Sequence, residues 1–395
     1  MNLLFLCLFP PALDGSGYSN RELILRLLPR GYDIQVIAQP CPGDQTYDQA
    51  FFAEHGVQIW RVPCELAYED TPPSEDQQAS VNKYIQHHLT QQRPDLVVIG
   101  HDSWCWYGPT VQRFSIPTVQ FVRGTPTRAI TQGIYPPAAT ESFIKHLLSA
   151  NHIVSVAEHF KTLLLGLGAS PPNISVLYTP FEASSMVQTQ DNSQPARLKQ
   201  QLGIPPTHKI VLHASNHYPV KRIMDFFASA KIVQQHRQDV HYILLGEGPD
   251  TPKLMASLAS YPLRSRFHLL GRLPRQLVLD YMRASDLFVL CSESEGLPRV
   301  VLEAYATMLP VLVADMPAGR EITRVGTIGR LYPVGDVEQL AQKTLTALHQ
   351  TPEENARQTR LAKTFLAQNM TVRNQLDQLE MIFAELANRT RASKA

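Results

Sequence analysis

Short apolar runs alternate with amphipathic segments along most of the chain. Residues 3–8 form an uninterrupted apolar run, typical of a strand that is covered on both faces of a sheet. Residues 18–28 carry apolar side chains at helical spacing, and Pro29 to Gly31 ends that helix. Residues 33–37 form the next apolar run. This order of strand, helix and strand predicts a parallel sheet with right-handed crossovers.

The pattern continues to about residue 180, and polar residues follow the predicted strands. His101 and Arg123 each stand directly after a strand, while Gly15 follows the first strand. Because the carboxyl ends of parallel strands meet at the edge where open α/β sheets bind ligands, these three residues are expected on one rim. The further elements expected in this part are strands over 96–99, 118–122 and 153–156 and a helix over 142–150.

Polar and turn-forming residues interrupt the pattern at 179–197, and a second strand–helix series follows. Two Rossmann-like series joined by a linker predict two α/β domains that face each other across a cleft containing the active site. The tail is helical in pattern from 351 to 386. The strands expected in the second series cover 209–213, 241–245, 267–270, 287–290 and 310–314.

Length and composition agree with two ordinary globular domains. The chain has 395 residues, of which 44% are hydrophobic and 18% charged, which excludes a disordered or fibrous protein. The net charge of +1 argues against a general nucleic-acid binder. The total conceals a split, because the chain up to residue 185 holds 11 basic and 16 acidic residues and the remainder holds 25 and 19.

The five cysteines are scattered, which disfavours a disulfide framework or a zinc cluster and favours a reducing, cytoplasmic location. The apolar start lacks a basic region and a cleavage site, so a signal peptide is not expected. No stretch of about 18 uncharged apolar residues indicates a membrane span. No metalloprotease, Asp-x-Asp or serine-hydrolase motif occurs, so neither a metal nor a cofactor is expected.

The strongest chemical signal lies between a strand and the helix that follows it. That helix is expected to start near Leu297, with Pro298 in its first turn. Its free N–H groups and partial positive charge would suit a phosphate. Glu295 and Glu303 flank this anion site, and their carboxylates can accept hydrogen bonds from sugar hydroxyls. The alternative is a capping carboxylate plus an ordinary surface glutamate.

A second signal is the cationic turn after the first strand of the second series. Lys221 and Arg222 stand there, and Lys221 comes five residues after Asn216. Lysine is a compact charge suited to a diphosphate, and the alternative is a solvated turn without a ligand. Gly246 follows the next strand and is a weaker signal, because glycine after a strand is common in turns.

Two features near the N-terminus leave alternatives open. Gly15 and Gly17 lack the third glycine of the dinucleotide fingerprint, because Asn20 stands there, and this disfavours a nicotinamide cofactor. His101 is either a site residue or a hydrogen-bonded rim histidine. The aromatic cluster beside it, which begins at Trp104, is compatible with sugar stacking and with core packing.

Together these residues resemble the retaining glycosyltransferases of family four, which have the GT-B fold, over roughly residues 1–345. Glu295 and Glu303 match the family's Glu-x7-Glu motif, and the resemblance implies that they contact the donor sugar and the ribose. Lys221 falls on the family's diphosphate-binding lysine. Asn216 replaces a usual arginine in a short segment that is similar to the branch of N-acetylglucosaminyl malate synthases.

The resemblance also implies the domain plan and the position of the last helix. The expected N-terminal domain covers 1–180 and would hold the acceptor, and a linker covers 181–198. The donor domain covers 199–368, and residues 369–395 form a helix that crosses back to the first domain, followed by a tail. The strand over 118–122 usually ends in His-Gly, and here Arg123 replaces that histidine. Arginine stays protonated, so it would bind an anionic acceptor or phosphate rather than act as a base.

The activity implied is transfer of a sugar, with retention, from a nucleotide-diphosphate sugar to an acceptor hydroxyl without a metal. UDP-sugar is the expected donor, ahead of GDP-sugar or ADP-sugar, and the acceptor is a glycolipid, a polysaccharide or a small molecule. Glu295, Lys221, Arg123 and His101 are the candidates for catalysis. The remaining candidates for donor binding are Gly15, Gly17, Asn216, Arg222, Gly246, Gly296, Leu297, Pro298 and Glu303.

Two other readings of the sequence remain. One is another GT-B enzyme, such as a nucleotide-sugar epimerase or a phosphorylase. The other is a non-catalytic protein that binds nucleotide sugars, to which the replacements at Asn216 and Arg123 point. No nucleic-acid partner is expected, and peripheral contact with a membrane is compatible with the composition.

Overall fold

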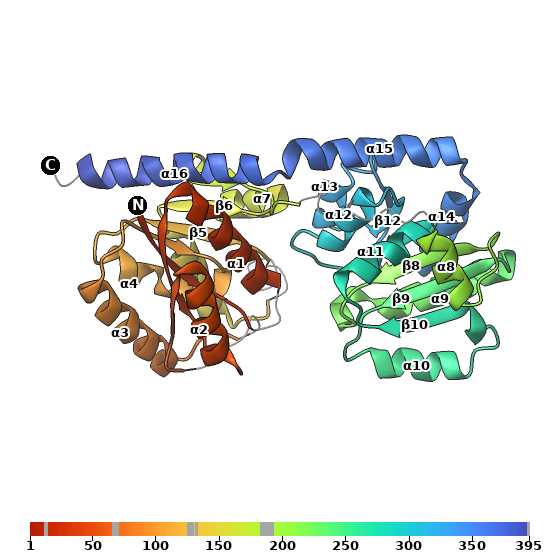
Figure 1. Cartoon of the computed structure of the whole chain (residues 1–395), viewed down its shortest axis with the longest axis horizontal. Helices are drawn as coiled ribbons and strands as arrows, with labels where there is room; N and C mark the ends of the chain where they lie inside the picture. The colour runs from red at the N-terminus through yellow and green to blue at the C-terminus, as the bar shows by residue number, and fades with distance from the viewer. Residues whose placement is uncertain (12–14, 65–70, 125–129, 131–132, 182–192, 393–395) are drawn as a thin grey trace. The chain divides into compact units, whose positions relative to one another are not determined.

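The chain forms two compact units (Figure 1). The first comprises Met1–Thr179 together with Arg373–Ala395, and the second comprises Pro180–Val372. Unit 1 contains 15 basic and 18 acidic residues and unit 2 contains 21 and 17, so the charge split is smaller than the linear division suggested. The computed structural model describes residues 1–11, 15–64, 71–124, 130, 133–181 and 193–392.

Unit 1 is built on a seven-stranded sheet in the order β3-β2-β1-β4-β5-β6-β7, in which every pairing is parallel. The central strand β1 is buried on both faces, as its continuous apolar run predicts. The predicted parallel sheet is therefore confirmed. Its strands are β1 (Asn2–Cys7), β2 (Asp33–Ala38), β3 (Gln58–Arg61), β4 (Leu96–Ile99), β5 (Thr118–Val122), β6 (His152–Ser155) and β7 (Ile174–Val176).

Helices pack on this sheet and close the core of unit 1 (Figure 1). The first helix begins at Gly15, three residues before the predicted start, so Gly15 and Gly17 lie within its first turn and not in a loop. The helices are α1 (Gly15–Leu27), α2 (Asp44–His55), α3 (Glu75–Gln91), α4 (Gly108–Gln112), α6 (Pro137–Leu148), α7 (Glu158–Gly166) and α16 (Val372–Ala392), and a 3-10 helix spans Asp102–Tyr107.

Unit 2 repeats the design with a six-stranded parallel sheet in the order β10-β9-β8-β11-β12-β13. Strand order reverses between β8 and β11, which places the loops after these two neighbouring strands beside each other. The strands are β8 (Lys209–Ala214), β9 (Val240–Leu245), β10 (Phe267–Gly271), β11 (Leu287–Leu290), β12 (Val311–Ala314) and β13 (Arg330–Tyr332).

The helices of unit 2 complete its core. Part of the predicted linker 181–198 lies outside the described residues, and its last residues enter α8, which packs against α11. The helices are α8 (Gln194–Gln201), α9 (Ile223–His236), α10 (Thr251–Ala259), α11 (Arg275–Ala284), α12 (Arg299–Ala306), α13 (Pro317–Ile322), α14 (Val337–His349) and α15 (Pro352–Asn369), with a 3-10 turn over Pro219–Lys221.

The C-terminal helix belongs to unit 1, as the fold prediction required. Arg30 forms an ion pair with Glu380 at 2.8 Å, and the rings of Tyr32 and Phe383 meet edge to face at 5.9 Å. The helical pattern over 351–386 corresponds to two helices, α15, which ends at Asn369, and α16, which begins at Val372. None of the described helices is long and apolar enough to cross a membrane.

Three histidines lie in a row at the first strands of unit 2, and Arg266 bridges the first two. His241 faces His208 at 3.2 Å and His268 at 3.0 Å, and Nη1 of Arg266 lies 3.1 Å from Nδ1 of His208 and 2.7 Å from Nε2 of His241. Since arginine only donates, both of these ring nitrogens accept, so neither carries a proton. Burial lowers the pKa of His268 and, aided by Arg266, that of His241 to about 4.

This row predicts that unit 2 loses stability in mild acid. A histidine with a lowered pKa binds fewer protons when folded than when unfolded, so its contribution is complete above about pH 6.5 and falls toward about pH 4. We expect the protection of the β9 and β10 amides against hydrogen exchange, relative to their intrinsic exchange rates, to fall between pH 7 and 5. His241→Gln should flatten that pH dependence, and an unchanged dependence in this variant would contradict the assignment.

Candidate functional site

Lys221 and Glu295 meet in unit 2. Lys221 ends the 3-10 turn after β8, and Glu295 lies in the loop after β11, which is the strand next to β8. The lysine Nζ donates to Oε1 of Glu295 at 2.7 Å, and Oγ of the buried Ser292 donates to the same oxygen at 2.7 Å. The side chains of Lys221 and Glu295 are 21% and 15% exposed. The two strongest sequence signals therefore form one partly buried ion pair.

Arg222 is held by carboxylates beside this pair. Its Nε donates to Asp225 at 2.7 Å and its Nη1 to Glu293 at 3.2 Å, and these contacts raise the pKa of the guanidinium. The backbone N–H of Glu293 donates to the carbonyl of Val220 at 3.0 Å. Arg222 therefore ties the two loops together, while Lys221 alone of the two cations contacts Glu295.

Glu303 lies inside α12 and contacts a neighbouring helix. Its Oε1 accepts from Nε of Arg275, the first residue of α11, at 3.0 Å. The Glu303 side chain is 14% exposed, compared with 53% for Arg275. The alternative of an ordinary solvated surface glutamate does not fit this burial.

The start of α12 differs from its prediction. The helix begins at Arg299, and Pro298 is the residue before it, with extended backbone angles of φ −71° and ψ 92°. Leu297 and Gly296 consequently lie in the loop between β11 and α12. The fixed φ of proline suits the residue just before a helix as well as the first helical turn. The presence of Pro298 in the sequence therefore could not locate the helix start to the residue. Pro298 has no side-chain donor or acceptor, so it cannot cap the first turn of α12.

The structure explains why glycine stands at position 246, which the weak sequence signal did not reveal. Its φ is +112°, and a Cβ at this position would lie 1.8 Å from the carbonyl oxygen of Ser215. The backbone of His217 donates to the carbonyl of Glu247 at 3.1 Å. The loops after β8 and β9 therefore pack backbone to backbone, and Asn216 is exposed at their edge.

His213, which the sequence analysis did not single out, holds the start of the loop after β8 through hydrogen bonds. It is fully buried, and burial lowers its pKa to about 3, so the ring is neutral. Its Nδ1 donates to the carbonyl of Val289 at 3.0 Å, because a carbonyl can only accept. Nε2 then accepts from Oγ of Ser215 at 2.8 Å. The position of His213 at the end of a buried strand could have identified it from the sequence. No sequence signal pointed to Ser292 or Arg275.

Unit 1 brings Arg123 and His101 to the same edge of its sheet. Asp102 accepts from the backbone N–H of Arg123 at 2.7 Å, and Nε of Arg123 donates to the carbonyl of Gly100 at 2.9 Å. Nη2 of Arg123 donates to Oδ1 of the buried Asn20 at 3.1 Å. Asn20, which occupies the place of the missing fingerprint glycine, is thus a direct partner of Arg123.

The aromatic residues beside His101 belong to the core. Trp104, Trp106 and Tyr107 are at most 4% exposed, so core packing and not sugar stacking explains them. His101 is 1% exposed, and its Nδ1 accepts from the backbone N–H of Ser103 at 3.2 Å. Its neutral form therefore carries the proton on Nε2.

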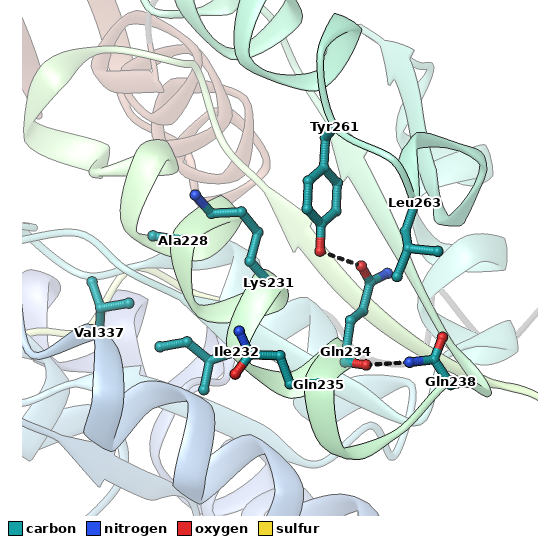
Figure 2. Close-up of a pocket in the computed structure, with 9 residues that line it drawn as sticks. All are labelled: Ala228, Lys231, Ile232, Gln234, Gln235, Gln238, Tyr261, Leu263 and Val337. Carbon is teal, nitrogen blue, oxygen red and sulfur yellow. Dashed lines mark hydrogen bonds between the residues drawn. The ribbon is translucent and has the colours of Figure 1, made fainter.

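A surface pocket of about 570 Å³ lies on unit 2 away from these loops (Figure 2). None of the predicted site residues lines it. Oε1 of Gln234 accepts from the Tyr261 hydroxyl at 2.9 Å, and the backbone carbonyl of Gln234 accepts from Nε2 of Gln238 at 2.6 Å. Within the described part of the chain, no group of three His, Cys, Asp or Glu side chains could hold a metal ion, and none of the five cysteines forms a disulfide.

Comparison with known proteins covers both units. Residues 13–184 match the family model described as Glycosyltransferase Family 4, and residues 195–364 match Glycosyl transferases group 1. N-acetyl-alpha-D-glucosaminyl L-malate synthase of Bacillus anthracis is 26% identical over 361 residues, which cover 88% of this chain and 89% of that protein.

Solved structures share the same fold. HepE of Anabaena, in complex with UDP-glucose, superposes with a TM-score of 0.77 at 18% identity, covering 98% of this chain and 100% of that one. Sucrose-phosphate synthase of Thermosynechococcus elongatus gives a TM-score of 0.78 at 14% identity, covering 98% and 99%. Two parallel Rossmann-like sheets and these neighbours define the GT-B fold. The two family models identify a glycosyltransferase with that fold. Within that class, the chain belongs to the family-four-like glycosyltransferases, as the sequence motifs predicted.

Substitution by alanine should change the free energy of unfolding differently at two of the candidate glycines. At Gly246 a Cβ would strike backbone and φ is positive, so Gly246→Ala should destabilise unit 2 by more than about 1 kcal/mol. At Gly15 a Cβ would have no neighbouring atom within 4 Å, so Gly15→Ala should be neutral or slightly stabilising. Urea unfolding of both variants tests this, and equal effects would contradict the geometry.

Proposed function

We propose that this glycosyltransferase moves a sugar, with retention, from a nucleoside-diphosphate sugar to an acceptor hydroxyl, and that UDP-sugar is its donor. The observation that carries the proposal is the Lys221–Glu295 pair at 2.7 Å in the loops after β8 and β11. The UDP-glucose complex of the similar HepE structure supports this choice of nucleotide. No metal or cofactor takes part in the proposed reaction.

Lys221 supplies the positive charge that the departing diphosphate needs. Bond cleavage at the anomeric carbon places negative charge on the leaving phosphate, and a preorganised cation stabilises that charge in the transition state. The ammonium is already fixed by Glu295, so little reorganisation is required when the charge develops. The uncapped first turn of α12 adds backbone N–H groups and a partial positive charge in the same loop.

Glu295 orients the donor sugar in this proposal. Its Oε1 accepts from Lys221 and Ser292, and no described contact engages Oε2. An ionised carboxylate has about four lone-pair directions, so Oε2 is suited to accept from sugar hydroxyls. Glu303 has the same character, with Oε1 on Arg275, and we assign it to the ribose hydroxyls.

Retention follows if the acceptor hydroxyl attacks on the face from which the diphosphate leaves. The new C–O bond then forms at the anomeric carbon as the old one breaks, and the leaving phosphate oxygen takes the acceptor proton. No side chain is needed as a base, which agrees with Arg123 replacing a histidine in unit 1. The acceptor is a glycolipid, a polysaccharide or a small molecule such as the malate named for the Bacillus anthracis relative.

Nucleotide selectivity gives the first test. Thermal-shift measurements with UDP, GDP and ADP should show the largest increase in melting temperature with UDP, because binding to the folded state stabilises it. A ligand at 100 times its Kd adds about 2.7 kcal/mol. No shift with any of the three would contradict a nucleotide-sugar enzyme, and a larger shift with GDP or ADP would change the donor.

Removal of the diphosphate cation gives the second test. Lys221→Ala should reduce kcat for sugar transfer at least about 100-fold, because the leaving group loses its preorganised charge. The exposed Lys253 on α10 provides the control, and Lys253→Ala should retain full activity. Activity of Lys221→Ala within a few fold of the parent would refute the assignment. Isomerised nucleotide sugar formed without an acceptor would indicate an epimerase.

A further inference from the structure

Arg275 contacts one of the proposed donor ligands, Glu303, and has no part in the proposed function. It is the first residue of α11, and α11 packs against α12, where Glu303 lies. The two side chains meet in one hydrogen bond, from Nε of Arg275 to Oε1 of Glu303, at 3.0 Å. No motif in the sequence pointed to this arginine.

The pair differs from an ordinary surface ion pair in its burial. Exposed pairs contribute little, because both charges remain solvated. Here the Glu303 side chain is 14% exposed, whereas the Arg275 side chain is 53% exposed. The carboxylate is therefore much less exposed than the cation with which it pairs.

The geometry resembles that of Glu295. In both glutamates Oε1 is held by protein donors, Lys221 and Ser292 in one case and Arg275 in the other. Among the described contacts, Oε2 has no donor in either residue. Anchoring one oxygen fixes the direction of the other, which is what recognition of a hydroxyl pair requires.

We propose that Arg275 is a positioning residue that orients Glu303 toward the ribose hydroxyls and thereby makes the site select ribonucleoside over 2′-deoxyribonucleoside diphosphates. This inference rests on the proposed function, since it takes Glu303 as the ribose ligand. A site built to accept a hydrogen bond from a hydroxyl rejects the analogue that lacks it, because the carboxylate oxygen that the hydroxyl would engage then has no donor. Selectivity is lost if the carboxylate can turn away.

The test compares a nucleoside diphosphate with its 2′-deoxy form in the full chain. Isothermal titration would use UDP and 2′-deoxy-UDP, or the corresponding pair if GDP or ADP stabilises the protein more. The parent protein should bind the ribonucleotide at least about 10-fold more tightly, since a hydrogen bond to a charged group contributes this much. In Arg275→Gln the ribonucleotide should weaken about 10-fold with little change for the deoxy form.

Arg275→Lys separates position from charge. Lysine keeps the charge without the planar guanidinium, so it should restore part of the lost selectivity. Arg283→Ala is the matched control, because Arg283 is an arginine of the same helix that pairs with Asp280 at 2.7 Å. That variant should keep the parent's selectivity.

The outcomes are distinguishable. Equal weakening of both nucleotides in Arg275→Gln, or unchanged selectivity, would overturn the role of Arg275 while leaving the proposed function intact. Failure of the parent protein to bind any of the three nucleoside diphosphates would overturn both. Selective loss for the ribonucleotide, with partial rescue by lysine, would support the assignment, because a purely structural role would affect the two nucleotides alike.

Discussion

The contact between Lys221 and Glu295 is the interaction around which the loops after β8 and β11 of unit 2 are arranged. A lysine and a glutamate that are both mostly removed from solvent require each other, because either one alone would be a poorly solvated charge. Their loops are brought together by the neighbouring strands β8 and β11 and joined again by Arg222 and Glu293. The pair is thus set by the sheet, and two donors fix the direction of the glutamate's other carboxylate oxygen.

In unit 1, Arg123 has neutral groups among its partners. Arg123 contacts a backbone carbonyl, the Asn20 amide and the face of Phe121, whose ring centroid lies 4.9 Å from the guanidinium carbon. Asp102 meanwhile accepts from the backbone N–H groups of Arg123 and Gly124. The guanidinium is therefore positioned by the ends of the strands, and the two departures from familiar motifs, Asn20 and Arg123, are one structural unit.

The apolar runs predicted both parallel sheets because buried strands have an unambiguous pattern. Lys221 and Glu295 were singled out for a different reason, since each matches a separate sequence motif of the family. Ser292, His213 and Arg275 were not, because their side chains act through contacts that only the folded loops, strands and helices bring together. The start of α12 escaped prediction because proline suits both sides of a helix boundary.

The return of the last helix to unit 1 affects how the protein is made. Domains tend to fold as units while the chain is being synthesised from its N-terminus. Unit 1 is encoded in two pieces, Met1–Thr179 and Arg373–Ala395, so it stays incomplete until the whole of unit 2 has been synthesised. Until then the surface around Tyr32 that α16 covers is open, and the first unit to begin folding is the last to finish.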